Sequence, residues 1–206
     1  MADEEQPQIY LVTPPEVALA EFAPRLEAVL DAHPVACLRL EFATRDADAV
    51  ARVADGLREI AHARDVPLVV AEHLALVERL GLDGVHLTDG ARSVRKAREM
   101  LGAEAIVGAF CGTSRHQGMS AGEAGADYIA FGPVVDTGLG DGTVAPRDLF
   151  AWWSEMIELP VVAEGALDAA RIADLAPVAD FFAVGEEIWR DADPAAALGA
   201  LIAAMG

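Results

Sequence analysis

Positive charge is scarce in this sequence. One lysine, Lys96, occurs among 206 residues, and 15 Lys and Arg face 34 Asp and Glu, which leaves a formal net charge of -19. Surfaces that bind nucleic acid or anionic membranes need clustered Lys and Arg, so the composition argues against both partners. A phosphorylated ligand would therefore depend on arginine, histidine, backbone N–H groups or a metal ion for its binding.

Cysteine and long hydrophobic runs are also scarce. Cys37 and Cys111 lie in apolar stretches without a CxxC or His-Cys cluster, so a zinc site is not expected. No apolar run approaches the roughly 20 residues that a membrane-spanning helix needs. The first residues, MADEEQPQ, are acidic and lack the apolar core of an export signal. These features predict a cytoplasmic protein with reduced, buried thiols.

Short apolar runs recur at regular intervals along the chain. Each is rich in Val, Ile or aromatic residues, which is typical of strands in a parallel sheet that is buried on both faces. Helical patterns separate these runs, and the first helix is expected over residues 15–30, with Pro15 in its first turn. The predicted strands are QIYLV, VACLRLEF, PLVVA, GVHL, AIVGAF, DYIAFG, PVVAEG and DFFAVG.

About eight strand–helix units in series predict an α/β protein, either a closed barrel or an open doubly wound sheet. The regular repeat and the absence of a GxGxxG turn after the first strand favour a closed (β/α)8 barrel, the TIM-barrel architecture. No linker or change in composition divides the chain. We therefore expect an acidic tail over residues 1–7 and one barrel domain over residues 8–206.

In such barrels the active site lies at the carboxyl ends of the strands. Gly165 and Gly185 follow the last two predicted strands, where glycine lets backbone N–H groups approach a phosphate closely. A short helix that begins near Glu186 would add its positive N-terminal end, although the Glu186 carboxylate would compete with an anion or cap the helix. Tight turns are the alternative reason for the glycines. The sequence favours a phosphate site at these three residues.

Three further features mark the same face. Arg39 and Glu41 alternate with leucines, so both side chains lie on one face of their strand, where they could pair or meet a ligand. The glycine-rich stretch 132–142 predicts a loop that closes over a ligand, or else a flexible insertion. Arg115 and His116 begin the fifth helix and form either an anion site or a capped surface turn.

Several segments resemble the thiamine phosphate synthase family and its relative, the aminothiazole tautomerase. LGLDGVHL looks like the family's fourth strand and GADYIAFGPV like its sixth, and PVVAEG and FFAVGEEIW extend the resemblance toward the end of the chain. The resemblance implies a barrel that couples a pyrimidine diphosphate to a thiazole phosphate, with Mg²⁺ and basic residues stabilising the diphosphate that leaves. The implied ligands are thiazole phosphate, pyrimidine diphosphate or thiamine phosphate. The sequence leaves open whether the chain forms a homo-oligomer.

The resemblance carries over only in part. Arg39 matches the arginine of the family's Gln-Leu-Arg motif, but Glu41 stands where a lysine is typical. Glu72 lies where the family has Asn-Asp, and Asp89 lies near its metal-binding aspartate. The residues expected to act are Arg39, His86, Arg115 and His116 in catalysis, Thr137 in the sixth loop, and Glu72 and Asp89 as Mg²⁺ ligands. A hydrogen-bonded core histidine is the alternative for His86. The replaced positions keep two alternatives open, namely a non-catalytic or regulatory barrel that binds a phosphorylated heterocycle, and a tautomerase-like enzyme with a histidine acid/base.

Overall fold

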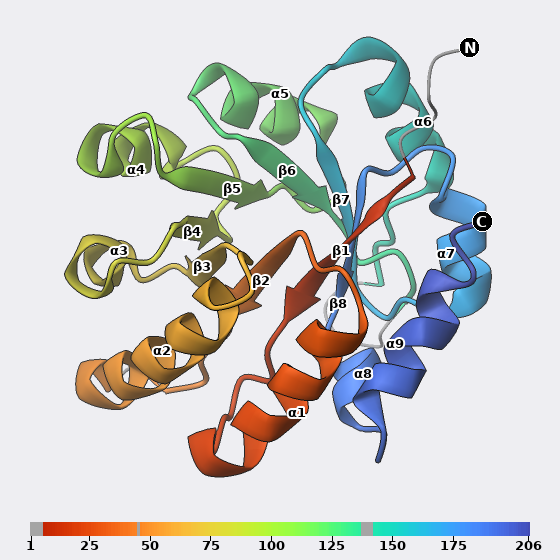
Figure 1. Ribbon diagram of the computed structural model, residues 1–206. Coiled ribbons are helices and arrows are strands. Elements are labelled where there is room, and N and C mark those ends of the chain that lie inside the picture. The colour runs from red at the N-terminus through yellow and green to blue at the C-terminus, as the bar shows by residue number, and fades with distance from the viewer. Residues whose placement is uncertain (1–5, 45, 137–141) are drawn as a thin grey trace.

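The computed structural model describes residues 6–44, 46–136 and 142–206. Within these residues, parallel strands pair in sequence order and β8 closes onto β1, so the sheet forms a barrel. Figure 1 shows the strands gathered at the centre of the molecule, with the helices arranged around them. The predicted (β/α)8 TIM barrel is confirmed, and every predicted strand segment contains an observed strand.

The strands of the barrel are short. They are β1 (Gln8–Val12), β2 (Cys37–Leu40), β3 (Leu68–Ala71), β4 (Gly84–Leu87), β5 (Ile106–Phe110), β6 (Tyr128–Phe131), β7 (Val161–Glu164) and β8 (Phe181–Val184). The helices that follow them are α1 (Leu19–Ala32), α2 (Ala47–His62), α3 (Leu74–Leu80), α4 (Val94–Leu101), α5 (Arg115–Glu123), α6 (Arg147–Met156), α7 (Ala169–Leu175), α8 (Glu186–Trp189) and α9 (Pro194–Ile202).

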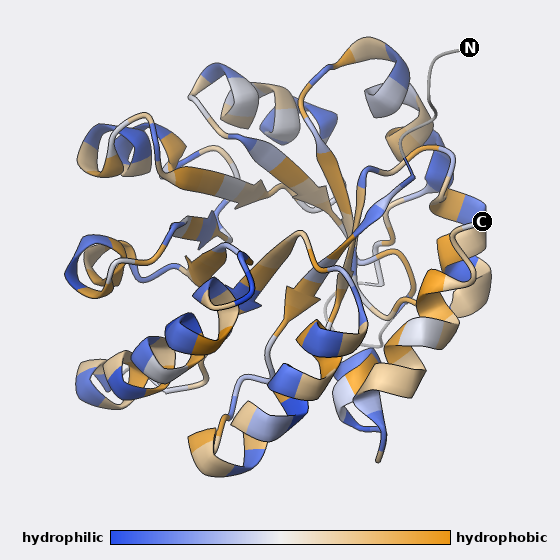
Figure 2. Ribbon diagram, in the orientation of Figure 1, coloured by the Kyte–Doolittle hydropathy of each residue, from blue (hydrophilic) through white to orange (hydrophobic). Residues whose placement is uncertain are grey.

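Alternate side chains of each strand point to opposite faces, which divides the core in two. One set packs outward beneath the helices, and most of the helix ribbons in Figure 2 show both hydrophobic and hydrophilic segments. The other set fills the inside of the barrel with a smaller cluster. This inner cluster consists of Tyr10, Cys37, Val69, Tyr128, Ala130, Val162 and Ala183.

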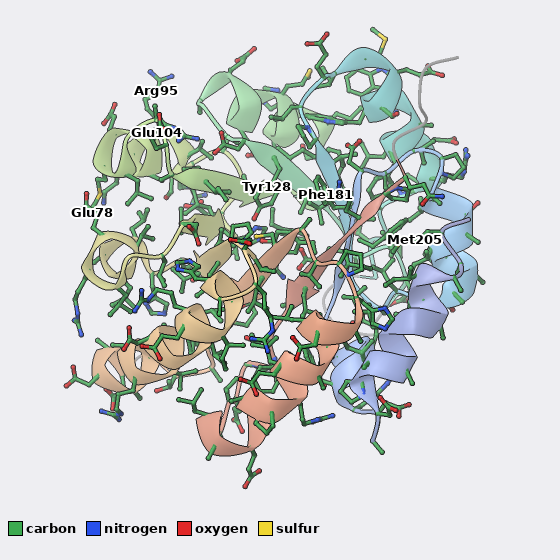
Figure 3. The ribbon with its side chains drawn as sticks, in the orientation of Figure 1. Glu78, Arg95, Glu104, Tyr128, Phe181 and Met205 are labelled. Atoms are coloured by element: carbon green, nitrogen blue, oxygen red, sulfur yellow. The ribbon has the colours of Figure 1, made fainter. Side chains whose placement is uncertain are left out.

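The strand register sets which inner side chains are neighbours. Arg39 pairs with Val69, His86 pairs with Gly108, and Gly108 pairs in turn with Tyr128 on β6. A Cβ atom on Gly108 would overlap the phenol ring of Tyr128. The glycine therefore makes room for a large ring inside the barrel, and Figure 3 places Tyr128 near the centre of the molecule.

The first helix begins later than its sequence pattern suggests. The expected start at Pro15 is wrong, because α1 begins at Leu19 after an extended Ala18. The Pro15 carbonyl accepts the backbone N–H of Ala43, and the Thr13 hydroxyl accepts that of Glu41 at 3.0 Å. These contacts hold the segment against the loop after β2, and they take precedence over the local preference for a helix.

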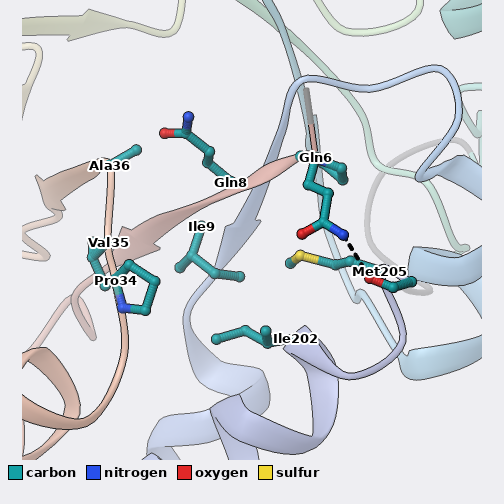
Figure 4. Close-up of a pocket in the computed structure, with 10 residues that line it drawn as sticks. Gln6, Gln8, Ile9, Pro34, Val35, Ala36, Ile202 and Met205 are labelled. Carbon is teal, nitrogen blue, oxygen red and sulfur yellow. Dashed lines mark hydrogen bonds between the residues drawn. The ribbon is translucent and has the colours of Figure 1, made fainter. Parts of the chain in front are cut away.

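The two ends of the described chain meet near the amino ends of the strands. The Gln6 side chain donates to the carbonyl of Gly206 at 3.0 Å, beside a cavity of about 450 Å³ that Ile202 and Met205 also line (Figure 4). Most of the predicted acidic tail lies outside the described residues. No helix in the described part of the chain has the length and hydropathy to span a membrane. Cys37 and Cys111 are free and buried, as expected.

Candidate active site

Arg39 on β2 is the centre of a polar network inside the barrel. Its side chain is 5% exposed and binds Glu164 on β7 in a bidentate manner, with Nη1–Oε2 at 2.9 Å and Nη2–Oε1 at 2.8 Å. Its Nε atom lies 2.9 Å from Oε1 of Glu41, which is an ion pair without the alignment of a hydrogen bond. The predicted shared face of Arg39 and Glu41 is therefore confirmed. The Arg39 cation is therefore held between two carboxylates, those of Glu41 and Glu164.

The network continues from Arg39 toward the opposite side of the barrel. Nη1 of Arg39 donates to Nε2 of His86 at 3.0 Å, and Nδ1 of His86 lies 2.9 Å from the hydroxyl of Tyr128. That hydroxyl lies 2.5 Å from the hydroxyl of Tyr10. Burial, together with the positive charge of Arg39, lowers the pKa of His86 to about 3. His86 is therefore neutral near pH 7.

The pKa values of the two carboxyls beside Arg39 shift in opposite directions. Burial alone would raise the pKa of Glu164, but the Arg39 guanidinium outweighs burial, so the pKa of this carboxyl is lowered. Burial also raises the pKa of Glu41, where Arg39 offsets it only in part and the charges of Glu164 and Glu72 add to it. With His86 neutral, one positive charge faces two negative ones, so the network has a net negative charge when both carboxyls are ionised.

Two more acidic residues, Glu72 and Asp89, follow the neighbouring strands β3 and β4. The Thr88 hydroxyl donates to Glu72, which is exposed. Oδ2 of Asp89 accepts from Ser93 at 2.6 Å, whereas its Oδ1 is buried without a hydrogen-bond partner. No group of three or more His, Cys, Asp or Glu in the described ranges is arranged as a metal site. Mg²⁺ commonly binds one or two protein carboxylates and completes its coordination shell with water and substrate phosphate. The unpartnered Oδ1 atom of Asp89 fits the role of such a carboxylate ligand.

The predicted phosphate loops follow β7 and β8, which are neighbours in the barrel. Gly165 has a φ of 98°, and a Cβ atom there would lie 2.8 Å from Cβ of Pro133, so the position excludes a side chain. Glu186 is exposed at the first position of α8. Its neighbour Glu187 accepts the backbone N–H of Gly185 at 2.7 Å and that of Leu167 at 3.2 Å, so this carboxylate ties the two loops together.

Arg115 and His116 lie apart from this network, in the first turn of α5. Ser114 caps the helix by accepting the backbone N–H of Gln117 at 3.2 Å, as the sequence indicates. The guanidinium of Arg115 lies 4.6 Å from the ring centroid of Trp152 and donates to the Asp148 carbonyl at 3.4 Å, so both of these contacts are with α6. His116 is exposed. Thr137 lies outside the described residues.

Sequence reasoning assigned no role to four residues of this site, which are Tyr10, Tyr128, Glu164 and Glu187, although Glu164 was placed at the end of its strand on the active-site face. Alternation along β7 could have revealed Glu164, because a buried arginine requires a carboxylate partner and Glu164 follows Val162 on the inward face. No comparable signal joins Tyr10 to Tyr128, which are 118 positions apart in the chain.

The closed barrel, with polar side chains near the carboxyl ends of β2, β4 and β7, places the protein in the (β/α)8-barrel class. Residues 9–188 match the family described as thiamine monophosphate synthase, and the chain belongs to that family. The thiamine-phosphate synthase of Rhodospirillum centenum is 42% identical, over 93% of this chain and 94% of the relative. That of Erythrobacter litoralis is 40% identical, over 95% of each chain.

Solved structures agree on the fold. Thiamine phosphate pyrophosphorylase from Pyrococcus furiosus superposes with a TM-score of 0.84 at 19% identity, covering 98% of this chain and 96% of that one. A 3-hexulose-6-phosphate synthase superposes with a TM-score of 0.71 at 17% identity, covering 96% of this chain and 100% of the other. At these identities the likeness concerns the barrel alone.

Proposed function

We propose that this protein is a thiamine-phosphate synthase, which couples a pyrimidine diphosphate to a thiazole phosphate and releases diphosphate. The observation that carries the proposal is the 42% identity to a protein of that name over 94% of the relative's length. The free, buried cysteines fit an enzyme that works in the reducing cytoplasm.

The loops after β7 and β8 are the proposed site for the thiazole phosphate. Gly165 and Gly185 begin two neighbouring loops at the carboxyl ends of their strands, where free backbone N–H groups are suitable donors to a phosphate. The N–H group of Gly185 is bonded to Glu187, so the donors would come from other residues of these loops. The tie through Glu187 supports this role, because it holds the two loops at a fixed separation before a ligand binds. Glu186 forms the exposed rim of this proposed phosphate site.

We propose two sources of positive charge within the chain for the part of the site that binds the diphosphate. Arg39 is a fixed cation below the mouth, where Glu164 and His86 set its orientation. Arg115 and His116 are the exposed source, and Arg115 would have to leave the Trp152 ring to reach a ligand. His86 is 1% exposed and both of its ring nitrogens are bonded, so we propose that it acts through Arg39 rather than on the ligand.

Glu72 and Asp89 are the residues that would hold Mg²⁺. The buried, unpartnered Oδ1 of Asp89 supports this assignment. Glu72 lies on the adjacent loop and accepts a hydrogen bond from Thr88, the residue before Asp89. When bound, Mg²⁺ supplies positive charge that stabilises the leaving diphosphate. This contribution matters here because the network around Arg39 has a net negative charge when both carboxyls are ionised.

The purified protein, incubated with pyrimidine diphosphate, thiazole phosphate and Mg²⁺, should form thiamine phosphate and release diphosphate. Asp89→Asn should raise the Mg²⁺ concentration needed for half-maximal rate by about tenfold, because metal affinity depends on the carboxylate. Asp191→Asn is the matched control on an exposed aspartate, and it should leave that concentration unchanged. Absence of product at every Mg²⁺ concentration would contradict the proposal.

A binding role without catalysis is the second candidate. It is favoured by the position of Arg39, whose nitrogen atoms all face protein partners instead of an open anion site. If no turnover occurs, titration with thiamine phosphate should still detect binding that is lost when Gly165 is replaced by valine. A tautomerase that uses His86 gains no support, because that ring is closed off from ligands.

A further inference from the structure

A continuous hydrogen-bonded chain crosses the interior of the barrel beneath the proposed site. It runs from Glu164 through Arg39, His86 and Tyr128 to Tyr10, which lie on β7, β2, β4, β6 and β1. Arg39 is 4% exposed, His86 1%, Tyr128 7% and Tyr10 2%. With so little exposure, water competes poorly for these bonds, and each group depends on its protein neighbour.

The direction of these bonds fixes where the His86 proton lies. A guanidinium donates hydrogen bonds and cannot accept them, so Nε2 of His86 must present a lone pair to Nη1 of Arg39. A neutral imidazole then has its proton on Nδ1, which donates to the Tyr128 hydroxyl at 2.9 Å. The other tautomer would direct an N–H group at the guanidinium and leave Nδ1 as an acceptor.

The packing around Tyr128 keeps its hydroxyl at that position. The Tyr128 ring stacks on the His86 ring, with centroids 5.8 Å apart and an interplanar angle of 18°. Gly108, between these two residues in the sheet register, supplies the space for the ring. The hydroxyl is therefore a built acceptor for the Nδ1 proton.

We propose that Tyr128 is a positioning residue, whose hydroxyl keeps the His86 proton on Nδ1 so that Nε2 holds the Arg39 guanidinium in place. Arg39 in turn sets the positions of the Glu164 and Glu41 carboxylates, which reach toward the mouth of the barrel. The consequence for turnover rests on the proposed synthase function. The tautomer itself does not, since it is a property of the protein without substrate.

The tautomer can be measured directly by long-range ¹H–¹⁵N correlation on protein with labelled histidine. The chain has five histidines, and His86 is assigned by the signals lost in His86→Gln. In the wild type, His86 should show a protonated Nδ1 and a bare Nε2 from about pH 5 to pH 8, the range in which an ordinary histidine titrates. A protonated Nε2 in the wild type would overturn the proposal even if no variant folds.

Tyr128→Phe and Tyr10→Phe form a matched pair, since each removes one buried hydroxyl and retains the ring. Tyr128→Phe should mix or invert the His86 tautomers, whereas Tyr10→Phe should leave the Nδ1–H form unchanged because Tyr10 has no hydrogen bond to His86. Unchanged His86 signals in Tyr128→Phe, or equal shifts in both variants, would refute the role of Tyr128.

Kinetics test the second half of the proposal. Tyr128→Phe should lower kcat by about tenfold, as loss of an outer-shell orienting group commonly does, while KM for both substrates stays within about twofold. Asp191→Asn, at an exposed position, is the kinetic control and should keep kcat within about twofold. A wild type without turnover would refute the synthase function and leave the tautomer assignment standing, whereas a normal kcat with an altered tautomer would refute the link to catalysis.

Discussion

The barrel interior and its rim use arginine in different ways. Arg39 in the interior is 4% exposed and is held by two carboxylates and an imidazole. Arg115 at the rim is exposed, lies against the Trp152 ring and donates a long hydrogen bond to the Asp148 carbonyl. Burial makes every unmade bond costly, so the interior charge is fixed, whereas a rim charge can change partners at little cost. In this barrel the interior contacts hold Arg39 in one orientation. A positive charge that moves to meet a ligand would have to come from the rim or from a bound metal ion.

Loss of the Glu164 carboxylate should give the largest change in stability. Glu164→Ala leaves the Arg39 guanidinium buried without its bidentate partner, so we expect the free energy of unfolding to fall by about 3–5 kcal/mol. Urea unfolding at pH 7 measures this change. Glu158→Ala, at an exposed position, should stay within about 0.5 kcal/mol of the wild type. Equal losses in the two variants would contradict the distinction between buried and exposed charges.

A smaller loss is expected from filling the space beside Tyr128. Gly108→Ala adds a methyl group that overlaps the phenol ring, and overpacking of this kind costs about 1–3 kcal/mol. The double variant Gly108→Ala with Tyr128→Leu should recover part of the loss, because the smaller side chain removes the overlap. Thermal unfolding of the two variants measures this recovery of stability. If the double variant is no more stable than Gly108→Ala, the loss does not come from overlap with the Tyr128 ring.

Glu41 stands at the border between the two regions, and its effect should depend on pH. Because its pKa is raised in the folded protein, ionisation of Glu41 weakens folding as pH rises from the unfolded value of about 4.3 through the folded-state pKa. Glu41→Gln should therefore stabilise the protein by up to about 1 kcal/mol at pH 7 and lose this advantage below about pH 4. Paired urea titrations at both pH values measure the difference, and a gain at acid pH alone would reverse the assigned sign.

Arg115 at the rim should matter least for stability. Arg115→Gln removes an exposed cation–π contact, so the free energy of unfolding should change by about 0.5–1 kcal/mol. If the proposed role in diphosphate binding is correct, the same variant should raise KM for the pyrimidine diphosphate by roughly tenfold, the effect of about 1.4 kcal/mol. Steady-state kinetics measure this KM, and an unchanged value would mean that Arg115 makes only the surface contact with Trp152.

The sequence was sufficient for the strands but not for every helix start. Strands buried on both faces, such as Leu68–Ala71, leave continuous apolar runs that can be recognised without a partner. The start of α1 could not be found in this way, because Thr13 and Pro15 are held by contacts with Glu41 and Ala43 in another loop. Such contacts have no trace in the local pattern.

The candidate site was predictable where one strand contains it. Alternation placed Arg39 and Glu41 on one face, and their ion pair at 2.9 Å follows from that placement. The contact of His86 with Tyr128 depends on barrel closure and register, which no short segment encodes. At the eighth loop the prediction named Glu186, yet the adjacent Glu187 bonds to the loops, because one step along a helix turns a side chain by about 100°.

The missing side chain at Gly108 has a consequence for how this family member can diverge. A residue larger than glycine at position 108 is compatible with the barrel only when the ring at position 128 has become smaller, so a change at position 108 depends on an earlier or simultaneous change at position 128. Replacing Tyr128 first would open a void and remove the acceptor for His86. Replacing Gly108 first would force the ring out of the interior. A larger residue at position 108 alone would therefore give a less stable protein, and loss of the tyrosine alone would remove a hydrogen bond to His86.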